Sequence, residues 1–347
     1  MNNQIQKYSF KEIFEKKYWD DSLNEFDDAN IYQSWEYARV VQNEKDIKHL
    51  AFFSGDVLMG LAQVRIKRVP FLGWGIAYIF KGPVWLKKKQ EPNVEVLFNI
   101  LKLLEHEFVI KNKLVVRVHP YLYSDYNYLN NTGIDFTYNL TSPKDPHKTV
   151  VLYLDIELEE IRKKLKQKWR NCLNQSERNG LNVVSGTDKV LYDTFLKLYD
   201  KMIERKKFKE YVNPRDVGKL IDVFGNNSKL MTFVAFKDQT PVSALVGAGL
   251  GNTGIYLLGA SNKLGMKNKA SYLLQWEMIK WLKRNGITRY DLGGIDSVKN
   301  PGVYKFKTGI TEFEVEEIGA FDIVNSKLQG LFIGLIKLFR SIKKSVF

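Results

Sequence analysis

One stretch near the end of the chain gathers residue types that could perform acyl transfer. It runs from Tyr290 to Gly309 and reads YDLGGIDSVKNPGVYKFKTG. Apolar and polar residues alternate before Gly293-Gly294, as in a half-buried strand. The two glycines let the backbone leave the sheet at torsion angles that other residues rarely adopt. Pro301-Gly302 predicts a second turn, followed by helical spacing that places Lys305 and Lys307 beside an apolar face. These features are typical of a binding loop in which a lysine side chain supplies a fixed positive charge.

Lys307 is the candidate catalytic residue of this stretch. An amine that attacks an ester or thioester passes through a tetrahedral intermediate whose oxygen is negatively charged, and a fixed cation can stabilise that oxygen by roughly 3 kcal/mol. Phe306 would help to bury the lysine, and Tyr304 could line the site. From spacing alone, the simpler interpretation of Lys307 is an exposed lysine at the start of a helix.

A second candidate site lies in the segment GASNKLGMKNKAS, residues 259–271. A glycine-containing loop leads there into a helix predicted to begin near Ala270. Lys267, Asn268 and Lys269 precede that helix, whose first N–H groups would suit a phosphate. We therefore predict that these three residues bind a phosphate group.

The elements that must position both sites occur twice in the sequence. The first set comprises the strand-like runs HLAFFS, LMGLAQVRI and WGIAYIF, a helix over 94–111 and the strand LVVRVHP. The second comprises LMTFVAF, VSALVGAGL and GIYLLGA, a helix over 269–284 and the strand ITRYDLGG. The two helices are separated by roughly 175 to 180 residues, a period that suggests a duplicated domain.

This pattern predicts an α/β fold with two tandem domains, 1–148 and 149–325, joined near residues 143–149. Between the repeated sets lies a helical stripe over 158–178, which leaves a basic face that includes Arg170, and a further helix over 191–206. The last segment, 326–347, predicts an amphipathic helix with lysines and arginine opposite its apolar face. It could lie on acidic lipid or dock on the protein itself or on another subunit.

Composition narrows the class of protein and partner. The chain has 347 residues, 44% of them hydrophobic, and a formal net charge of +14. Such a chain is globular, and its charge suggests an anionic partner: nucleic acid, an acidic membrane surface or a phosphorylated substrate. A single cysteine, Cys172, excludes an internal disulfide, and residues 1–17 lack the apolar core of a signal peptide. We predict a cytoplasmic protein that can lie peripherally on the inner face of the plasma membrane.

Several familiar motifs are excluded on physical grounds. Gly249, Gly251 and Gly254 match a dinucleotide-binding pattern, but predicted strands flank them where that motif needs a helix, so we predict a hairpin turn. The four histidines have no metal-ligand spacing, and one cysteine cannot form a zinc cluster. The sequence therefore predicts no metal and no cofactor.

The ordered motifs resemble the Fem-type aminoacyltransferases, which build peptidoglycan cross-bridges and have the GNAT acyltransferase fold. The resemblance rests on a strand ending in Gly-Gly followed by Gly-x-Tyr-x-Phe-Lys-x-Gly, here Gly302, Tyr304, Phe306, Lys307 and Gly309. It continues at IYQSWEYA (31–38), KWRNCLNQSERNG (168–180) and Gly-Ala-Ser (259–261).

This resemblance implies two GNAT-like domains, each a mixed, mostly antiparallel sheet flanked by helices, with a cleft along their contact. It implies transfer of an amino acid from aminoacyl-tRNA to an amine of a lipid-linked or nucleotide-linked muramyl peptide, with Lys307 and Phe306 at the transfer step. The resemblance also implies that Lys267, Asn268 and Lys269 bind the donor. The candidate substrate-binding residues are Tyr304, Arg170, Arg205, Arg215, Tyr256, Arg39, Trp35 and Lys305.

The sequence departs from the family pattern in the first domain. Val41 stands where the family often has a lysine, with Arg39 nearby, and His119-Pro120 replaces Asp-Pro. Two alternatives stay open: a GNAT-fold acyltransferase that decorates a cell-surface glycan from acyl-CoA or another donor, and a non-catalytic protein that binds RNA or acidic membranes. The last predicts that Lys307→Ala leaves the function intact.

Overall fold

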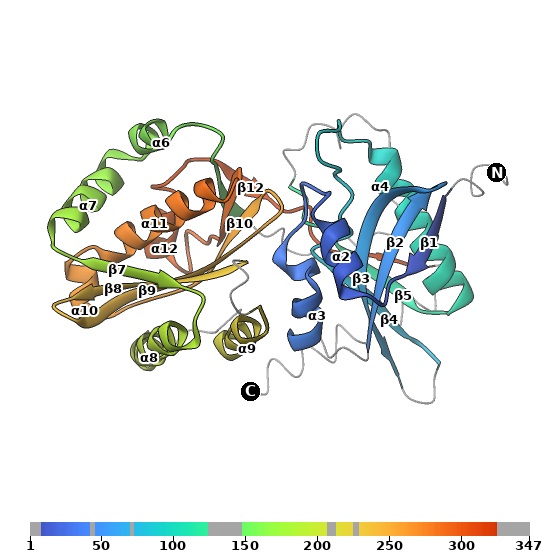
Figure 1. Ribbon diagram of the computed structural model, residues 1–347, viewed down its shortest axis with the longest axis horizontal. Coiled ribbons are helices and arrows are strands. Elements are labelled where there is room, and N and C mark those ends of the chain that lie inside the picture. Colours follow the sequence, from blue (N-terminus) through green and yellow to red (C-terminus); the bar gives the residue numbers. More distant parts are fainter. Residues whose placement is uncertain are drawn as a thin grey trace. The chain divides into compact units, whose positions relative to one another are not determined.

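The computed structural model describes residues 8–41, 46–69, 73–123, 148–206, 213–224 and 229–324 (Figure 1). The chain divides into two compact units. Unit 1 comprises Met1–Ser22, Gln42–Pro146 and Ile318–Phe347, and unit 2 comprises Leu23–Val41 and His147–Glu317. These units differ from the predicted division at residue 148 because a segment from each end of the chain joins the other half. The predicted tail helix over 326–347 lies outside the described residues.

Unit 1 is built on a six-stranded sheet of order β1-β2-β3-β4-β5-β13. Its neighbouring strands are antiparallel except for the parallel pair β4 and β5. The strands are β1 (Tyr8–Glu12), β2 (Ile47–Ser54), β3 (Val57–Arg68), β4 (Gly75–Phe80), β5 (Val115–His119) and β13 (Phe321–Ile323). The helical segments before β2 and between β4 and β5 are α2 (Lys16–Leu23), η1 (Ile31–Gln33), α3 (Trp35–Val41), α4 (Val94–Leu104) and the π-helix η3 (Glu105–Lys111), of which η1 and α3 belong to unit 2.

Local sequence explains the main elements of unit 1. Gly55 has φ +59°, the left-handed conformation that the predicted β2–β3 turn requires. The Asn93 side chain accepts a hydrogen bond from the Glu95 N–H and so begins α4. The apolar face of α4, including Leu97 and Ile100, then packs in the core against Phe52 of β2.

Unit 2 is built on a seven-stranded sheet of order β12-β6-β11-β10-β9-β8-β7. Only β10 and β11 are parallel. The strands are β6 (Lys148–Tyr153), β7 (Asn182–Gly186), β8 (Leu230–Lys237), β9 (Thr240–Leu250), β10 (Thr253–Ser261), β11 (Arg289–Gly294) and β12 (Glu314–Glu316). The helices are α6 (Leu158–Lys164), α7 (Gln167–Arg178), α8 (Lys189–Lys206), α9 (Pro214–Phe224), α10 (Lys263–Lys267), α11 (Ala270–Arg284) and α12 (Pro301–Lys307).

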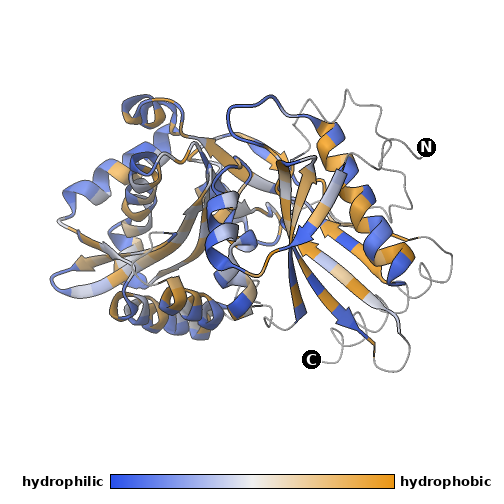
Figure 2. Cartoon of the chain, turned by 45° about the vertical axis from the view of Figure 1, so that its right-hand side comes forward, coloured by the Kyte–Doolittle hydropathy of each residue, from blue (hydrophilic) through white to orange (hydrophobic). Residues whose placement is uncertain are grey.

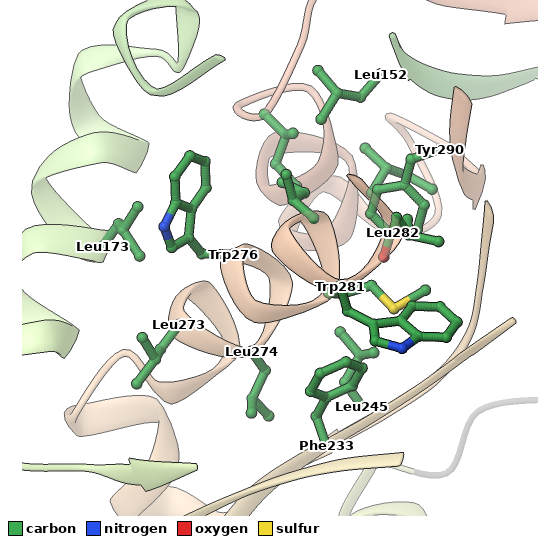
Figure 3. Close-up of a cluster of buried hydrophobic side chains, with 14 of the residues drawn as sticks. Leu152, Leu173, Phe233, Leu245, Leu273, Leu274, Trp276, Trp281, Leu282 and Tyr290 are labelled. Atoms are coloured by element: carbon green, nitrogen blue, oxygen red, sulfur yellow. The ribbon is translucent and has the colours of Figure 1, made fainter. Parts of the chain in front are cut away.

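Helix α11 forms the centre of the unit 2 core. It covers one face of the sheet, and α8 covers the other (Figure 1). Trp281 of α11 lies with its ring centre 6.4 Å from that of Phe233 on β8, beside Leu245 of β9 (Figure 3). Hydrophobic residues run along the strands of both sheets, whereas the helices are mixed along their length (Figure 2). Each sheet is therefore the apolar layer against which helices pack.

The predicted fold class and its repeated topology are confirmed. In both units antiparallel strands lead into a helix, and the strand after that helix pairs in parallel: β4, α4 and β5 in unit 1, and β10, α11 and β11 in unit 2. The predicted hairpin turn at the Gly249 to Gly254 motif is also confirmed. Gly251 supplies the turn with φ +60°, and Leu282 of α11 fills the space where a Gly254 side chain would lie.

The predicted helix over 158–178 is wrong in one respect, because it is broken into α6 and α7. Leu165 and Lys166 both take extended ψ angles of 139°, and the Lys166 N–H donates to the Gly309 carbonyl at 3.0 Å. The apolar stripe nevertheless packs as predicted, with Ile161, Leu165, Trp169 and Leu173 all buried. Within the described part of the chain, no helix combines the length and the apolar character needed to cross a bilayer.

Candidate active site

The carboxyl end of β11 forms the floor of the candidate site. The pairing of β11 with β6 is regular at Asp291, shifts over the next residues and resumes at Gly294. Gly293 has φ +74° within this irregularity, a conformation that residues with side chains rarely adopt. The predicted exit of the backbone from the sheet at Gly293-Gly294 is therefore present, and it takes the form of a β-bulge.

Helix α12 places Lys307 over this bulge. The Asn300 side chain accepts a hydrogen bond from the Val303 N–H and so begins the helix. Pro301 lies in the first turn, where a helix tolerates proline well. Lys305 faces solvent, whereas Lys307 at the end of the helix is only 7% exposed. The simpler interpretation of Lys307, an exposed surface lysine, is therefore wrong.

The Lys307 ammonium has two close neighbours. Nζ donates a hydrogen bond to the Gly294 carbonyl oxygen at 2.8 Å and lies 5.6 Å from the centre of the Tyr256 ring. Burial lowers the pKa of Lys307 from 10.5 to about 8, and the negative charge of Asp291 opposes that change. The side chain is therefore a cation at neutral pH that is unusually close to losing its proton.

Tyr256 owes its position to a glycine on the same strand. A Cβ atom at Gly259 would lie 1.9 Å from the Tyr256 hydroxyl oxygen, so only glycine leaves room for that hydroxyl. Burial raises the pKa of Tyr256 to about 12. The hydroxyl is therefore neutral at physiological pH and can take part in hydrogen bonds without adding charge.

An aromatic cluster supports the helix that carries the lysine. Phe306 packs against Tyr272 of α11, with ring centres 5.0 Å apart, and against Trp169 of α7 at 6.1 Å. A Cβ atom at Gly309 would lie 2.7 Å from Trp169 Cδ1. The last glycine of the motif thus allows the Trp169 ring to approach the chain directly after α12.

The other predicted donor-binding and substrate-binding residues lie in separate places. Lys267, Asn268 and Lys269 form the turn between α10 and α11, where the Asn268 carbonyl accepts a hydrogen bond from Asn179 and Lys269 takes a left-handed conformation. Tyr304 donates a hydrogen bond to Glu314 at 2.6 Å. Of the predicted site residues, Lys307 and Tyr256 lie side by side, whereas Phe306 contacts Tyr272 and Trp169.

The predicted arginines are spread over several helices. Arg170 on α7 donates to the Lys163 carbonyl at 2.8 Å. Arg39 is exposed on α3, the helix that begins with the half-buried Trp35, and Arg215 is exposed on α9. Arg205 belongs to α8, but its side chain lies outside the described part of the structure. Their assignment to substrate binding stays a prediction.

Asp291 and Thr149 were absent from the predicted site residues. Both are buried, and the Thr149 hydroxyl donates a hydrogen bond to Asp291 Oδ1, which also accepts one from the Gly293 N–H at 2.8 Å. The sequence did contain a signal for the second contact, because aspartate side chains often bond the backbone two residues further on. No local pattern identifies Thr149, because its strand, β6, is adjacent to β11 in the sheet but far from Asp291 in the sequence.

The family model described as FemAB family matches residues 229–337. The matched stretch contains β8 to β13, with Tyr256, the glycine bulge and Lys307. The Fem-type resemblance seen in the sequence is thereby confirmed.

Two curated relatives of this chain have named activities. It is 28% identical over 159 residues to the UDP-N-acetylmuramoylpentapeptide-lysine N(6)-alanyltransferase of Weissella viridescens, which is 45% of this chain and 46% of that protein. It is 34% identical over 79 residues to the lipid II:glycine glycyltransferase of Staphylococcus epidermidis, 21% of this chain and 19% of that protein. The chain thus matches about half of the first relative's length and less of the second's.

The fold of this chain is also similar to that in the crystal structure of FemX. The TM-score is 0.77 at 17% sequence identity, and the similarity covers 94% of this chain and 99% of that chain. At this level of identity the likeness shows the fold alone.

Proposed function

We propose that this protein is an aminoacyltransferase that moves an amino acid from aminoacyl-tRNA to an amine of a lipid-linked or nucleotide-linked muramyl peptide. The observation that carries the proposal is the buried side chain of Lys307, the lysine of the Phe-Lys motif, whose ammonium donates a hydrogen bond to the Gly294 carbonyl. The names of the two relatives, which specify a muramoylpentapeptide and lipid II, support this class of acceptor.

The reaction needs one negative charge to be stabilised. The acceptor amine attacks the carbonyl carbon of the aminoacyl ester, a C–N bond forms, and an electron pair moves to the carbonyl oxygen. An ammonium has three N–H donors, and Lys307 uses one on Gly294. The others can donate to the oxyanion. Collapse of the intermediate breaks the C–O bond to the tRNA ribose, and the proton lost by the amine ends on the ribose oxygen.

The protonation state of Lys307 suits this role at neutral pH. A pKa of about 8 keeps roughly nine in ten of the side chains charged near pH 7. Burial also strengthens the interaction of that charge with an oxyanion, because little water screens it. The Tyr256 ring lies beside the charge, and Phe306 packs α12 against Tyr272 and Trp169.

The test is transfer of a labelled amino acid by the wild type and by Lys307→Met. We expect Lys307→Met to lose transfer by about a hundredfold or more, since the cation would be missing from the oxyanion. Lys299→Met is the matched control, because Lys299 is an exposed lysine in the loop before α12. Equal rates for Lys307→Met and the wild type would exclude the catalytic role.

The donor is tested in the same assay. Labelled aminoacyl-tRNA and labelled acyl-CoA are offered separately with a muramyl peptide acceptor. We expect transfer from aminoacyl-tRNA. Transfer from acyl-CoA together with none from aminoacyl-tRNA would reject the proposed donor and favour the acyl-CoA enzyme.

A further inference from the structure

The bulge at the end of β11 has a defined construction. Asp291 stands opposite Val151 of β6, and the next paired residue, Gly294, stands opposite Thr149. Two residues of β11 therefore face a single residue of β6, which bends the strand at this point. The carbonyl that accepts the Lys307 hydrogen bond belongs to Gly294, the residue that ends the bulge.

One carboxylate oxygen spans this bulge. Asp291 is 5% exposed, and its Oδ1 accepts hydrogen bonds from the Gly293 N–H at 2.8 Å and from Thr149 Oγ1, whose residue is 1% exposed. The first bond fixes the backbone within the bulge, and the second ties it to β6. Because Thr149 is buried and Gly293 is half-buried, loss of this acceptor would leave their donors poorly compensated.

The same carboxylate also acts on Lys307 through its charge. Its attraction favours the ammonium, whereas burial favours the neutral amine. Asp291 is thus connected with Lys307 in two ways. It bonds the backbone next to the Gly294 carbonyl, and its charge attracts the Lys307 ammonium.

We propose that Asp291 is the positioning residue of this site: fixed by Thr149, it holds the Gly293-Gly294 bulge that aims the Lys307 ammonium, and it supplies a negative charge that attracts that ammonium. The inference rests on the proposed function, because it assigns Asp291 a role in preparing the lysine for transfer. Asp291 acts through Lys307 and need not touch substrate.

Other titratable groups surround the pair. The Tyr256 ring faces Lys307 from β10, and Tyr199 of α8 in turn acts on Tyr256. Tyr32 of η1 and Tyr290 of β11 both sense the charge of Asp291, and Glu317 acts on Tyr32 as well. Burial raises the pKa of Tyr32, Tyr256 and Tyr290, so these three side chains stay neutral while Lys307 titrates.

The experiment separates charge from shape. Asp291→Asn keeps an oxygen that can accept both hydrogen bonds and removes only the charge, whereas Asp291→Ala removes both. The pKa of Lys307 is measured by NMR on full-length protein with isotope-labelled lysine, and the resonance is assigned by its loss in Lys307→Met. Asp296→Asn is the matched control, since Asp296 is a nearby loop aspartate that also accepts backbone hydrogen bonds.

The expected result is a fall in the Lys307 pKa by about one unit in Asp291→Asn and no change in Asp296→Asn. In the transfer assay, the loss of rate at alkaline pH should begin at a pH lower by the same amount. An unchanged Lys307 pKa in Asp291→Asn would overturn the inference. A shifted pKa in a protein that transfers no amino acid would refute the proposed function and leave the positioning role of Asp291 standing.

Discussion

At the scale of single residues, Lys307 links stability to pH. Its pKa is about 8 in the folded protein and 10.5 when unperturbed. Between these values the unfolded chain binds more protons than the folded one, so stability rises with pH across that window. Below about pH 8 the buried ammonium costs stability, on the order of 3 kcal/mol.

Lys307→Met should remove this dependence. The difference in unfolding free energy between Lys307→Met and the wild type should shrink by about 2 kcal/mol between about pH 7.5 and about pH 9.5, because the wild type alone loses its penalty. Urea unfolding at both pH values measures it. A constant difference would mean that Lys307 titrates normally and is not enclosed.

Tyr256 and Gly259 form a second residue pair with a testable fit. Gly259→Ala would place a methyl group on the Tyr256 hydroxyl, so the ring must turn away from Lys307. We expect a loss of about 1–3 kcal/mol in stability and a marked loss of transfer.

Tyr256→Phe should restore stability when it is combined with Gly259→Ala, since it removes the clashing oxygen. Gly302→Ala is the stability control, because no atom lies within 4 Å of the Cβ position there. If the double variant is no more stable than Gly259→Ala, the clash is not the cause.

At the scale of elements, the residues at the break between α6 and α7 contact the chain directly after α12. The Lys166 N–H bonds the Gly309 carbonyl, and the Trp169 ring occupies the space beside Gly309. Gly309→Ala should therefore lower the unfolding temperature, with a loss of about 1–3 kcal/mol, because its methyl group would meet the Trp169 ring. Thermal unfolding beside Gly302→Ala measures the effect, and an equal unfolding temperature for the two variants would contradict this packing.

Sequence patterns predicted most elements but not this break. Alternation and helical spacing identified the strands of the two repeated sets and α11 because those patterns are local. Ile161, Leu165, Trp169 and Leu173 keep a helical spacing through the break, so periodicity alone implies one helix. Its cause lies in a contact with Gly309, which is remote in sequence. The same reason explains why Lys307 and the glycine pair could be predicted, whereas the contact between Thr149 and Asp291 could not.

At the scale of the whole molecule, the high positive charge and the basic segment 326–347 belong to one hypothesis about location. We expect a chain truncated after Asn325 to bind anionic vesicles less than the full chain, because the segment pairs an apolar face with lysines and arginine. Vesicle flotation at two salt concentrations checks this. Undiminished flotation of the truncated chain would locate any membrane affinity elsewhere.

The division into units has a consequence for synthesis of the protein on the ribosome. Unit 1 begins at the N-terminus, yet β13, the edge strand that pairs with β5, comes after all of unit 2. Until β13 emerges, β5 presents an open backbone edge, which is a hazard for aggregation. The sheet of unit 1 is therefore completed only after all of unit 2 has been synthesised.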